Sequence, residues 1–90
     1  MTTSTVPEVI VRGGERIDPR EIEAVLRGHP EVEDVSVAGQ PSRMWGETVA
    51  AVVRLRPRSY ATREELHAYC REHLARYKAP SNWVFTTLPS

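Results

Sequence analysis

The sequence predicts an α+β fold, in which a small sheet with an N-terminal Gly-Gly hairpin carries two main helices packed on it. Three observations predict this class. A Gly-Gly pair between two short apolar segments is typical of a hairpin, two stretches carry apolar residues at helical spacing, and three others alternate or run apolar as strands do. With 90 residues and no internal repeat, the chain is expected to form one small domain.

The hairpin is expected between Val9 and Ile17, where apolar half-strands at residues 9–11 and 16–17 flank Gly13-Gly14. Glycine adopts the positive φ angles that a two-residue hairpin loop requires. Because glycine has no side chain, this turn also leaves its backbone bare for the close approach of a ligand.

The first helix is expected over residues 19–27. Asp18 is a good N-cap, proline at position 19 suits the first helical position, and Glu21 would complete a capping box. Gly28 is well placed to end the helix. Its apolar face comprises Ile22, Val25 and Leu26.

Strands are expected at three later places. Val35 and Val37 alternate with polar residues, which predicts a half-buried strand, whereas the continuous apolar run at residues 49–53 predicts a strand covered on both faces. These two are expected to pair. Residues 39–46 are expected to form a loop between them, and a short strand at residues 82–86 is expected to close the domain.

The second helix is expected to start at Thr62, with Glu65 completing its capping box. Its apolar stripe would comprise Leu66, Tyr69, Cys70, His73 and Leu74, with His67 off the stripe and solvated. Cys70 and His73 are interpreted as core packing, because a metal site needs another ligand and a nucleophile needs an oriented base.

Composition excludes several classes of function. Twelve basic residues balance twelve acidic ones, so no overall charge attracts nucleic acid or an anionic membrane. A single cysteine excludes an internal disulfide, and no apolar run has the length of a membrane span. Phosphate-loop, zinc-protease and serine-nucleophile motifs are absent. The residues alone therefore predict no catalytic group and no metal, and a cytoplasmic protein.

Five motifs stand in an order that identifies a family. The hairpin and first helix read VIVRGGERIDPREIEAVL, and HPEV, WGE, YKAP and a closing LP follow. Together they resemble the C-terminal domain of the adenylate-forming superfamily, which comprises acyl- and aryl-CoA ligases, adenylation domains of peptide synthetases and luciferases. The resemblance covers about residues 8–90, whereas residues 1–7 are expected to be a non-native or linker segment.

The resemblance implies the function of a mobile lid. In this superfamily a carboxylic acid and ATP form an acyl-adenylate and pyrophosphate, and a thiol then displaces AMP. The lid rotates on a large N-terminal domain between the two steps, so the parent protein would use ATP, Mg and CoA. The family's catalytic lysine lies a few residues after a Leu-Pro pair. Here the chain stops at Ser90, directly after Leu88-Pro89. The isolated chain is therefore expected to lack that lysine and to be inactive.

The resemblance also implies which residues meet the thiol substrate. Gly13 and Gly14 match the backbone that lines the pantetheine tunnel, although turn geometry alone would require the same glycines. Trp45 and Tyr77 match aromatic residues that flank the CoA adenine, and simple packing is the alternative for both. The candidates for the CoA phosphates are Lys78, Arg71 and Arg76.

Other basic and acidic positions allow two interpretations each. Glu15 and Arg16 on the hairpin either approach the AMP or thiol site or are solvated strand residues. Arg54, Arg56 and Arg58 either hold a phosphate or are ordinary solvated strand ends.

Two alternatives to a CoA ligase remain open. The domain could be the lid of a peptide-synthetase adenylation domain, whose thiol is carried on the phosphopantetheine arm of a carrier protein. It could also be a standalone regulatory or binding module. The sequence does not name the carboxylic acid, because the large domain selects that substrate in this superfamily.

Overall fold

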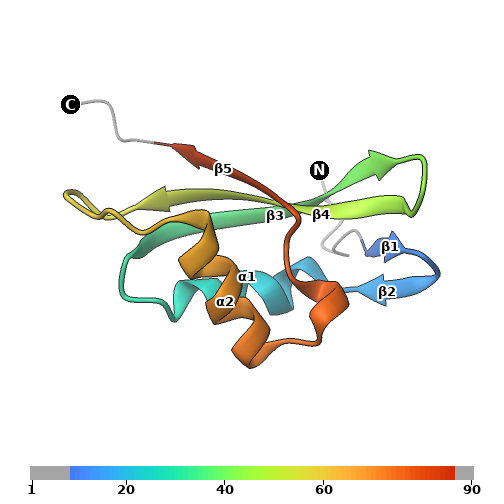
Figure 1. Cartoon of the computed structure of the whole chain (residues 1–90), viewed down its shortest axis with the longest axis horizontal. Coiled ribbons are helices and arrows are strands. Elements are labelled where there is room, and N and C mark those ends of the chain that lie inside the picture. The colour runs from blue at the N-terminus through green and yellow to red at the C-terminus, as the bar shows by residue number, and fades with distance from the viewer. Residues whose placement is uncertain (1–8, 87–90) are drawn as a thin grey trace, which may run out of the picture.

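The computed structural model describes residues 9–86, so the segment 1–8 and the closing Leu88-Pro89 lie outside the described residues. The elements follow the order expected for an α+β domain (Figure 1). They are β1 (Ile10–Arg12), β2 (Glu15–Ile17), α1 (Pro19–Arg27), β3 (Val32–Ser42), β4 (Gly46–Leu55), α2 (Arg63–His73), the 3₁₀ turn η1 (Arg76–Lys78) and β5 (Asn82–Thr86).

The five strands form one sheet with β4 at its centre. One edge of β4 pairs antiparallel with β3 along almost its whole length. The other edge is shared, because β1 meets β4 only at the pair Arg12–Gly46 and β5 runs parallel to it from Ala50 to Arg54. Strand β2 pairs with β1 and completes the N-terminal hairpin.

Both helices cover the same face of this sheet, as Figure 1 shows below the long β3–β4 ribbon. The core lies between the helices and the sheet. It comprises residues from β1, β2, β3 and β4 and from both helices. Its fully buried members include Ile10, Ile17, Ile22, Leu26, Val49, Ala51, Val53, Leu66 and Cys70. The predicted fold class is confirmed.

The long central hairpin differs from the expectation. Residues 39–46 were expected to be a loop, but β3 continues to Ser42 and β4 begins at Gly46, so only three residues form the turn. Pro41 is tolerated because β3 is an edge strand, where a missing backbone N–H costs no ladder hydrogen bond. The pairing of Gln40 with Thr48 and of Pro41 with Glu47 overrides the loop propensity of this segment.

Strand β4 is covered on one face only, so the expectation of a strand buried on both faces is wrong. Val49, Ala51 and Val53 point to the helices, whereas Val52 is 42% exposed on the opposite face. Its partner on β5, Val84, is also exposed. The alternation of buried and exposed positions was not visible in the sequence, because alanine and valine occupy both faces of this strand.

The two helix starts have different caps. Asp18 accepts a hydrogen bond from the backbone N–H of Arg20 at 2.9 Å, as an N-cap should. The expected capping box does not form there, because the Glu21 carboxylate instead accepts from Lys78 Nζ. At α2 the capping box of Thr62 and Glu65 is present, as expected.

The apolar stripe of α2 is narrower than expected. Leu66, Cys70 and Leu74 are buried, but Tyr69 is half-buried and His73 is exposed. The imidazole of His73 packs against the Tyr69 ring, with centroids 4.5 Å apart, and this pair lies at the margin of the core. Cys70 is buried away from solvent, which raises the pKa of its thiol to about 11.

Side chains of α1 occupy the outer edge of β3. The backbone N–H of Val37 donates to Glu23 Oε2 at 2.9 Å, and Arg27 Nη2 donates to the Val35 carbonyl at 3.2 Å. Glu23 and Arg27 are themselves an i,i+4 ion pair at 3.9 Å. Helix α1 thus supplies hydrogen-bond partners to an edge that would otherwise face solvent.

Residues 9–86 lack two further features. No helix there is long and apolar enough to cross a membrane. Within the same residues, no three His, Cys, Asp or Glu side chains gather as ligands of a metal ion would.

Candidate functional site

The tip of the N-terminal hairpin is a two-residue turn with left-handed backbone at both positions. Gly13 has φ +56° and Gly14 has φ +85°, and the flanking residues Arg12 and Glu15 pair across the turn. Positive φ at both central residues matches the twist of the strands and strongly favours glycine. The predicted hairpin is confirmed in position and geometry.

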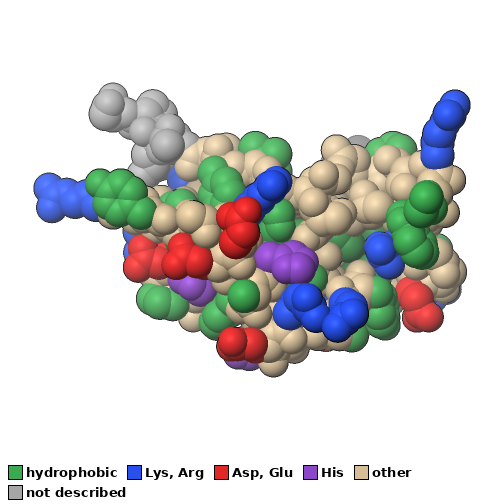
Figure 2. Space-filling model, viewed as in Figure 1, with side chains coloured by type: hydrophobic (Ala, Val, Ile, Leu, Met, Phe, Trp, Pro, Cys, Tyr) green, Lys and Arg blue, Asp and Glu red, His purple; other side chains and the backbone are tan. Residues whose placement is uncertain are grey.

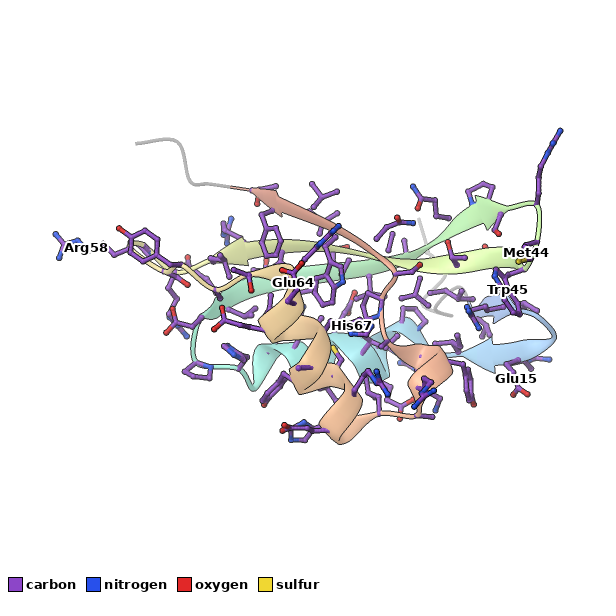
Figure 3. The ribbon with its side chains drawn as sticks, in the orientation of Figure 1. Glu15, Met44, Trp45, Arg58, Glu64 and His67 are labelled. Carbon is purple, nitrogen blue, oxygen red and sulfur yellow. The ribbon has the colours of Figure 1, made fainter. Side chains whose placement is uncertain are left out.

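The hairpin rests on the turn between β3 and β4. The backbone N–H of Gly13 donates to the Trp45 carbonyl at 2.8 Å, and the Arg12 guanidinium lies over the Trp45 ring at 4.2 Å from its centroid. The backbone N–H of Val11 donates to Glu47 Oε1 at 2.8 Å. These three contacts fix the tip of the hairpin against the main sheet, at the end where Figure 3 shows Glu15, Met44 and Trp45.

The two glycines of the turn have different surroundings. A Cβ on Gly13 would lie 2.8 Å from Trp45 Cε3, which is closer than atoms of this kind approach. A Cβ on Gly14 would meet nothing within 4 Å. Gly13 is therefore required by its packing on Trp45, whereas Gly14 faces open space that another molecule can fill.

The two candidate stacking residues lie on different elements. Trp45 is 40% exposed at the β3–β4 turn, with Arg12 over its ring. Tyr77 lies in η1 and packs half-buried against the core. Within the described residues the two rings make no aromatic contact with each other. The two side chains therefore lie on separate elements and do not pack on each other.

Lys78 is engaged in an ion pair. Its Nζ lies 2.8 Å from Glu21 Oε1, which joins η1 to the first turn of α1. The hydrogen bond from the lysine to Glu21 raises the pKa of Lys78 above its ordinary value, so the ammonium stays charged at neutral pH. A phosphate that binds Lys78 would have to share it with this carboxylate.

Arg71 lies elsewhere, in the wall of an open groove of about 400 Å³ between α2 and the start of β5. The groove lining is mixed in character and does not include Lys78: Arg63, Glu64, His67, Ala68, Arg71, Pro80, Ser81 and Trp83. Glu64 and His67, both labelled in Figure 3, lie on the side of α2 that forms this groove. The basic residues predicted for phosphates are thus distributed between two places.

The remaining charged candidates are on the surface. Glu15 and Arg16 are both exposed on β2. Arg54 pairs with Glu33 and Asp34, and Arg56 Nε donates to the Pro30 carbonyl at 2.9 Å. Arg58 lies at the end of the molecule opposite Glu15 and Trp45 (Figure 3). Arg54 and Arg56 thus both have partners within the domain. Acidic and basic groups are interspersed on the face seen in Figure 2.

Three residues that organise the site were not recognisable as such from the sequence: Arg12, Glu47 and Glu21, the last of which was predicted only as part of a helix cap. Glu47 stood inside the WGE motif, and Arg12 directly precedes the glycine pair. Position within or beside a motif was the available signal, because these side chains act through partners distant in sequence, such as Val11 for Glu47 and Lys78 for Glu21.

Comparison with known proteins agrees with this architecture. Residues 21–90 match the family described as AMP-binding enzyme C-terminal domain. The 2-succinylbenzoate–CoA ligase of Geobacillus kaustophilus is 42% identical over 78 residues, which are 87% of this chain and 16% of that protein. The chain spans about 15% of the length of the curated relatives it matches.

Solved structures show the same fold. A fatty acyl CoA synthetase of Mycobacterium tuberculosis superposes with a TM-score of 0.81 at 40% identity, covering 87% of this chain and 15% of that one. The amide bond synthetase McbA of Marinactinospora thermotolerans gives a TM-score of 0.86 at 30% identity, covering 93% and 17%. The chain therefore belongs to the AMP-binding enzyme C-terminal domain family, the C-terminal domain of the adenylate-forming superfamily.

Proposed function

We propose that this domain is the mobile C-terminal lid of an ATP-dependent acyl- or aryl-CoA ligase and supplies the face on which the thioester forms. The observation that carries the proposal is the hairpin tip, where Gly13 is packed on Trp45 and Gly14 faces open space. The identity of about 40% to CoA ligases over most of this chain supports the same assignment.

The proposed reaction is displacement of AMP from an acyl-adenylate by the thiol of CoA, which forms the thioester and releases AMP. ATP, Mg and the acid would be bound by the large N-terminal domain that is this lid's partner. The lid would close on that domain in a second orientation to complete the thiol site, a use of domain rotation that assembles one site at a time.

The hairpin suits a narrow channel for the pantetheine arm. The space that a side chain on Gly14 would occupy is empty to at least 4 Å, so an extended thiol arm can pass against the backbone. The left-handed φ of +85° at the same residue excludes most side chains independently. Glu15 and Arg16, exposed directly after the turn, would lie beside the reacting groups.

The nucleotide end of CoA is assigned to Trp45 and Tyr77 for the adenine, with Lys78 and Arg71 for the phosphates. Trp45 keeps 40% of its surface exposed, which leaves area for a base to stack. Arg71 lines an open groove and forms no ion pair within residues 9–86. Lys78 would contribute while it is shared with Glu21.

The test is a pair of substitutions in the ligase that carries this domain. Gly14→Ala and Gly14→Leu impose the same backbone strain, but only leucine adds bulk. We expect Gly14→Leu to impair thioester formation far more than adenylation, measured as separate half-reactions, and Gly14→Ala to impair it less. Equal loss of both half-reactions in the leucine variant would remove the tunnel assignment.

The acceptor is tested in the same assay. CoA should give an acyl-CoA product, whereas a carrier protein bearing phosphopantetheine should give none. Acylation of the carrier with no acyl-CoA would identify a peptide-synthetase lid instead. Acylation of an amine instead would indicate an activity like that named for its structural relative, the amide bond synthetase.

We also propose a cytoplasmic location. The only cysteine, Cys70, is a buried free thiol, which fits a reducing compartment. Fractionation of cells that express the full-length protein would test this, and recovery from a membrane or secreted fraction would contradict it.

A further inference from the structure

We propose that Glu47 is a positioning residue for the thioester-forming hairpin, acting through the backbone of Val11. The contact itself is inferred from the geometry of β1, β3 and β4. Its effect on thioester formation rests on the proposed function. Glu47 does not touch the turn glycines. Its carboxylate holds the strand that carries them.

Strand β1 needs such a contact because its pairing with β4 is very short. The two strands share one residue pair, Arg12–Gly46. In a two-residue hairpin the residues that flank the loop exchange both backbone hydrogen bonds, and the next pair along exchanges none. The N–H of Val11, which belongs to that next pair with Arg16, therefore points away from β2 and towards β4.

The Glu47 carboxylate takes the place of the missing ladder bond. Its Oε1 accepts from the Val11 N–H at 2.8 Å, a distance typical of charge-assisted hydrogen bonds. The neighbouring bond from the Gly13 N–H to the Trp45 carbonyl has the same length. The hairpin is thus held at two backbone donors two residues apart, and the two acceptors, on Trp45 and Glu47, flank the first residue of β4.

The third strand contributes room for the carboxylate. Gly39 on β3 has ordinary negative φ, so its backbone conformation does not require glycine. A Cβ at this position would lie 2.5 Å from Glu47 Oε2 and 3.4 Å from Ile10 Cγ1. Gly39 is therefore needed for space, and a methyl group there would displace the end of the Glu47 side chain from Val11.

If Glu47 acts by positioning, its function requires a hydrogen-bond acceptor at this place and does not require a negative charge. The partner of Glu47 is a neutral backbone amide, so a glutamine oxygen at the same place can also accept. A role as a general base, or as a ligand for a cation, would instead require the carboxylate. Glu47→Gln should therefore preserve the function, whereas Glu47→Ala and Gly39→Ala should both lose it by different routes.

The first experiment measures amide hydrogen exchange by NMR in the 90-residue chain. In Glu47→Ala and Gly39→Ala the Val11 amide should exchange roughly tenfold faster or more relative to the core amides, whereas Glu47→Gln should stay within about threefold of the parent. The matched control is Glu72→Ala, which removes an exposed carboxylate of α2 that makes no hydrogen bond within residues 9–86. Unchanged Val11 exchange in Glu47→Ala and Gly39→Ala would overturn the proposal.

The second experiment uses the ligase that carries this domain. Glu47→Ala and Gly39→Ala should raise KM for CoA or slow the thioester step by roughly tenfold, relative to any change in adenylation, and Glu47→Gln should restore it. If Glu47→Ala fails to fold, Gly39→Ala and Glu47→Gln still decide the matter. A thioester step that is lost equally in the glutamine variant would overturn positioning in favour of a role for the charge.

Failure of the proposed function has a different signature. A parent ligase that forms no thioester with CoA would refute the CoA-ligase assignment while the exchange result stands by itself. A parent that forms the thioester, with faster Val11 exchange in the variants and no change in the thioester step, would refute the catalytic meaning of the Glu47 contact alone.

Discussion

The two turn glycines should differ in how much stability they lose on substitution by alanine. Gly13 and Gly14 both have positive φ, at +56° and +85°, so alanine at either position meets the same kind of backbone strain. Only at Gly13 does the added methyl group meet a neighbour, the Trp45 ring at 2.8 Å. The pair therefore separates backbone strain from steric contact.

The magnitudes follow from these contacts. Left-handed backbone costs a non-glycine residue about 1–2 kcal/mol, which is the whole expected loss for Gly14→Ala. At Gly13 the Trp45 ring must also withdraw by about 0.6 Å to reach an ordinary contact distance. That shift weakens the stacking of Arg12 on the ring, worth about 0.5–1 kcal/mol at an exposed site, together with part of the ring packing. Gly13→Ala should therefore lose about 2–3 kcal/mol.

Thermal and urea denaturation of the 90-residue chain can resolve this difference. For a domain of this size, 1 kcal/mol corresponds to about 4–8 °C in Tm, so Gly13→Ala should melt at least about 4 °C below Gly14→Ala. Gly13→Ala should also change the fluorescence of Trp45, and Gly14→Ala should not. Equal melting temperatures would refute the claim that Gly13 is held by its contact with Trp45.

Two further predictions concern titratable groups. The hydrogen bonds from Arg20 hold the pKa of Asp18 below its ordinary value of 3.8, so this carboxylate stabilises α1 above about pH 4, and the contribution is lost as the pH falls through the folded-state pKa. The stability difference between the parent and Asp18→Asn should accordingly shrink on acidification, and a difference independent of pH between 2 and 6 would contradict the assignment. Burial raises the pKa of Cys70 to about 11, so at pH 8 a thiol reagent should modify it only as the domain unfolds. Fast labelling of the folded chain, with no dependence on denaturant, would show that the thiol is accessible.

The parts of this fold that sequence predicts well are those stabilised by close neighbours in the chain. The hairpin follows from Gly13-Gly14 because the backbone requirement is local, and the helix starts follow from Asp18 and Thr62 for the same reason. The capping box of α1 was wrong because a residue 57 positions away, Lys78, binds the Glu21 carboxylate. A prediction from neighbouring residues alone could not include that partner.

The central hairpin exceeded its predicted length for a similar reason. Gly39 and Pro41 have the composition of a loop, yet their ladder with β4 keeps them in a strand. The glycine serves the Glu47 carboxylate and the proline is tolerated at a sheet edge. The motif glycines of the candidate site were recognisable in the sequence, but its supports were not, because Arg12 and Glu47 act across strands.

The hydrogen bonds from α1 to the outer edge of β3 have a consequence for how the protein behaves at high concentration. An edge strand of 11 residues is long enough to recruit a second chain through backbone pairing, which is a common route to fibrils. Glu23 already accepts the Val37 N–H and Arg27 already donates to the Val35 carbonyl, so an incoming strand would have to break two formed bonds and would meet a charged pair. Helix α1 thereby opposes the addition of strands from other molecules to this edge, in addition to forming part of the core that supports the hairpin.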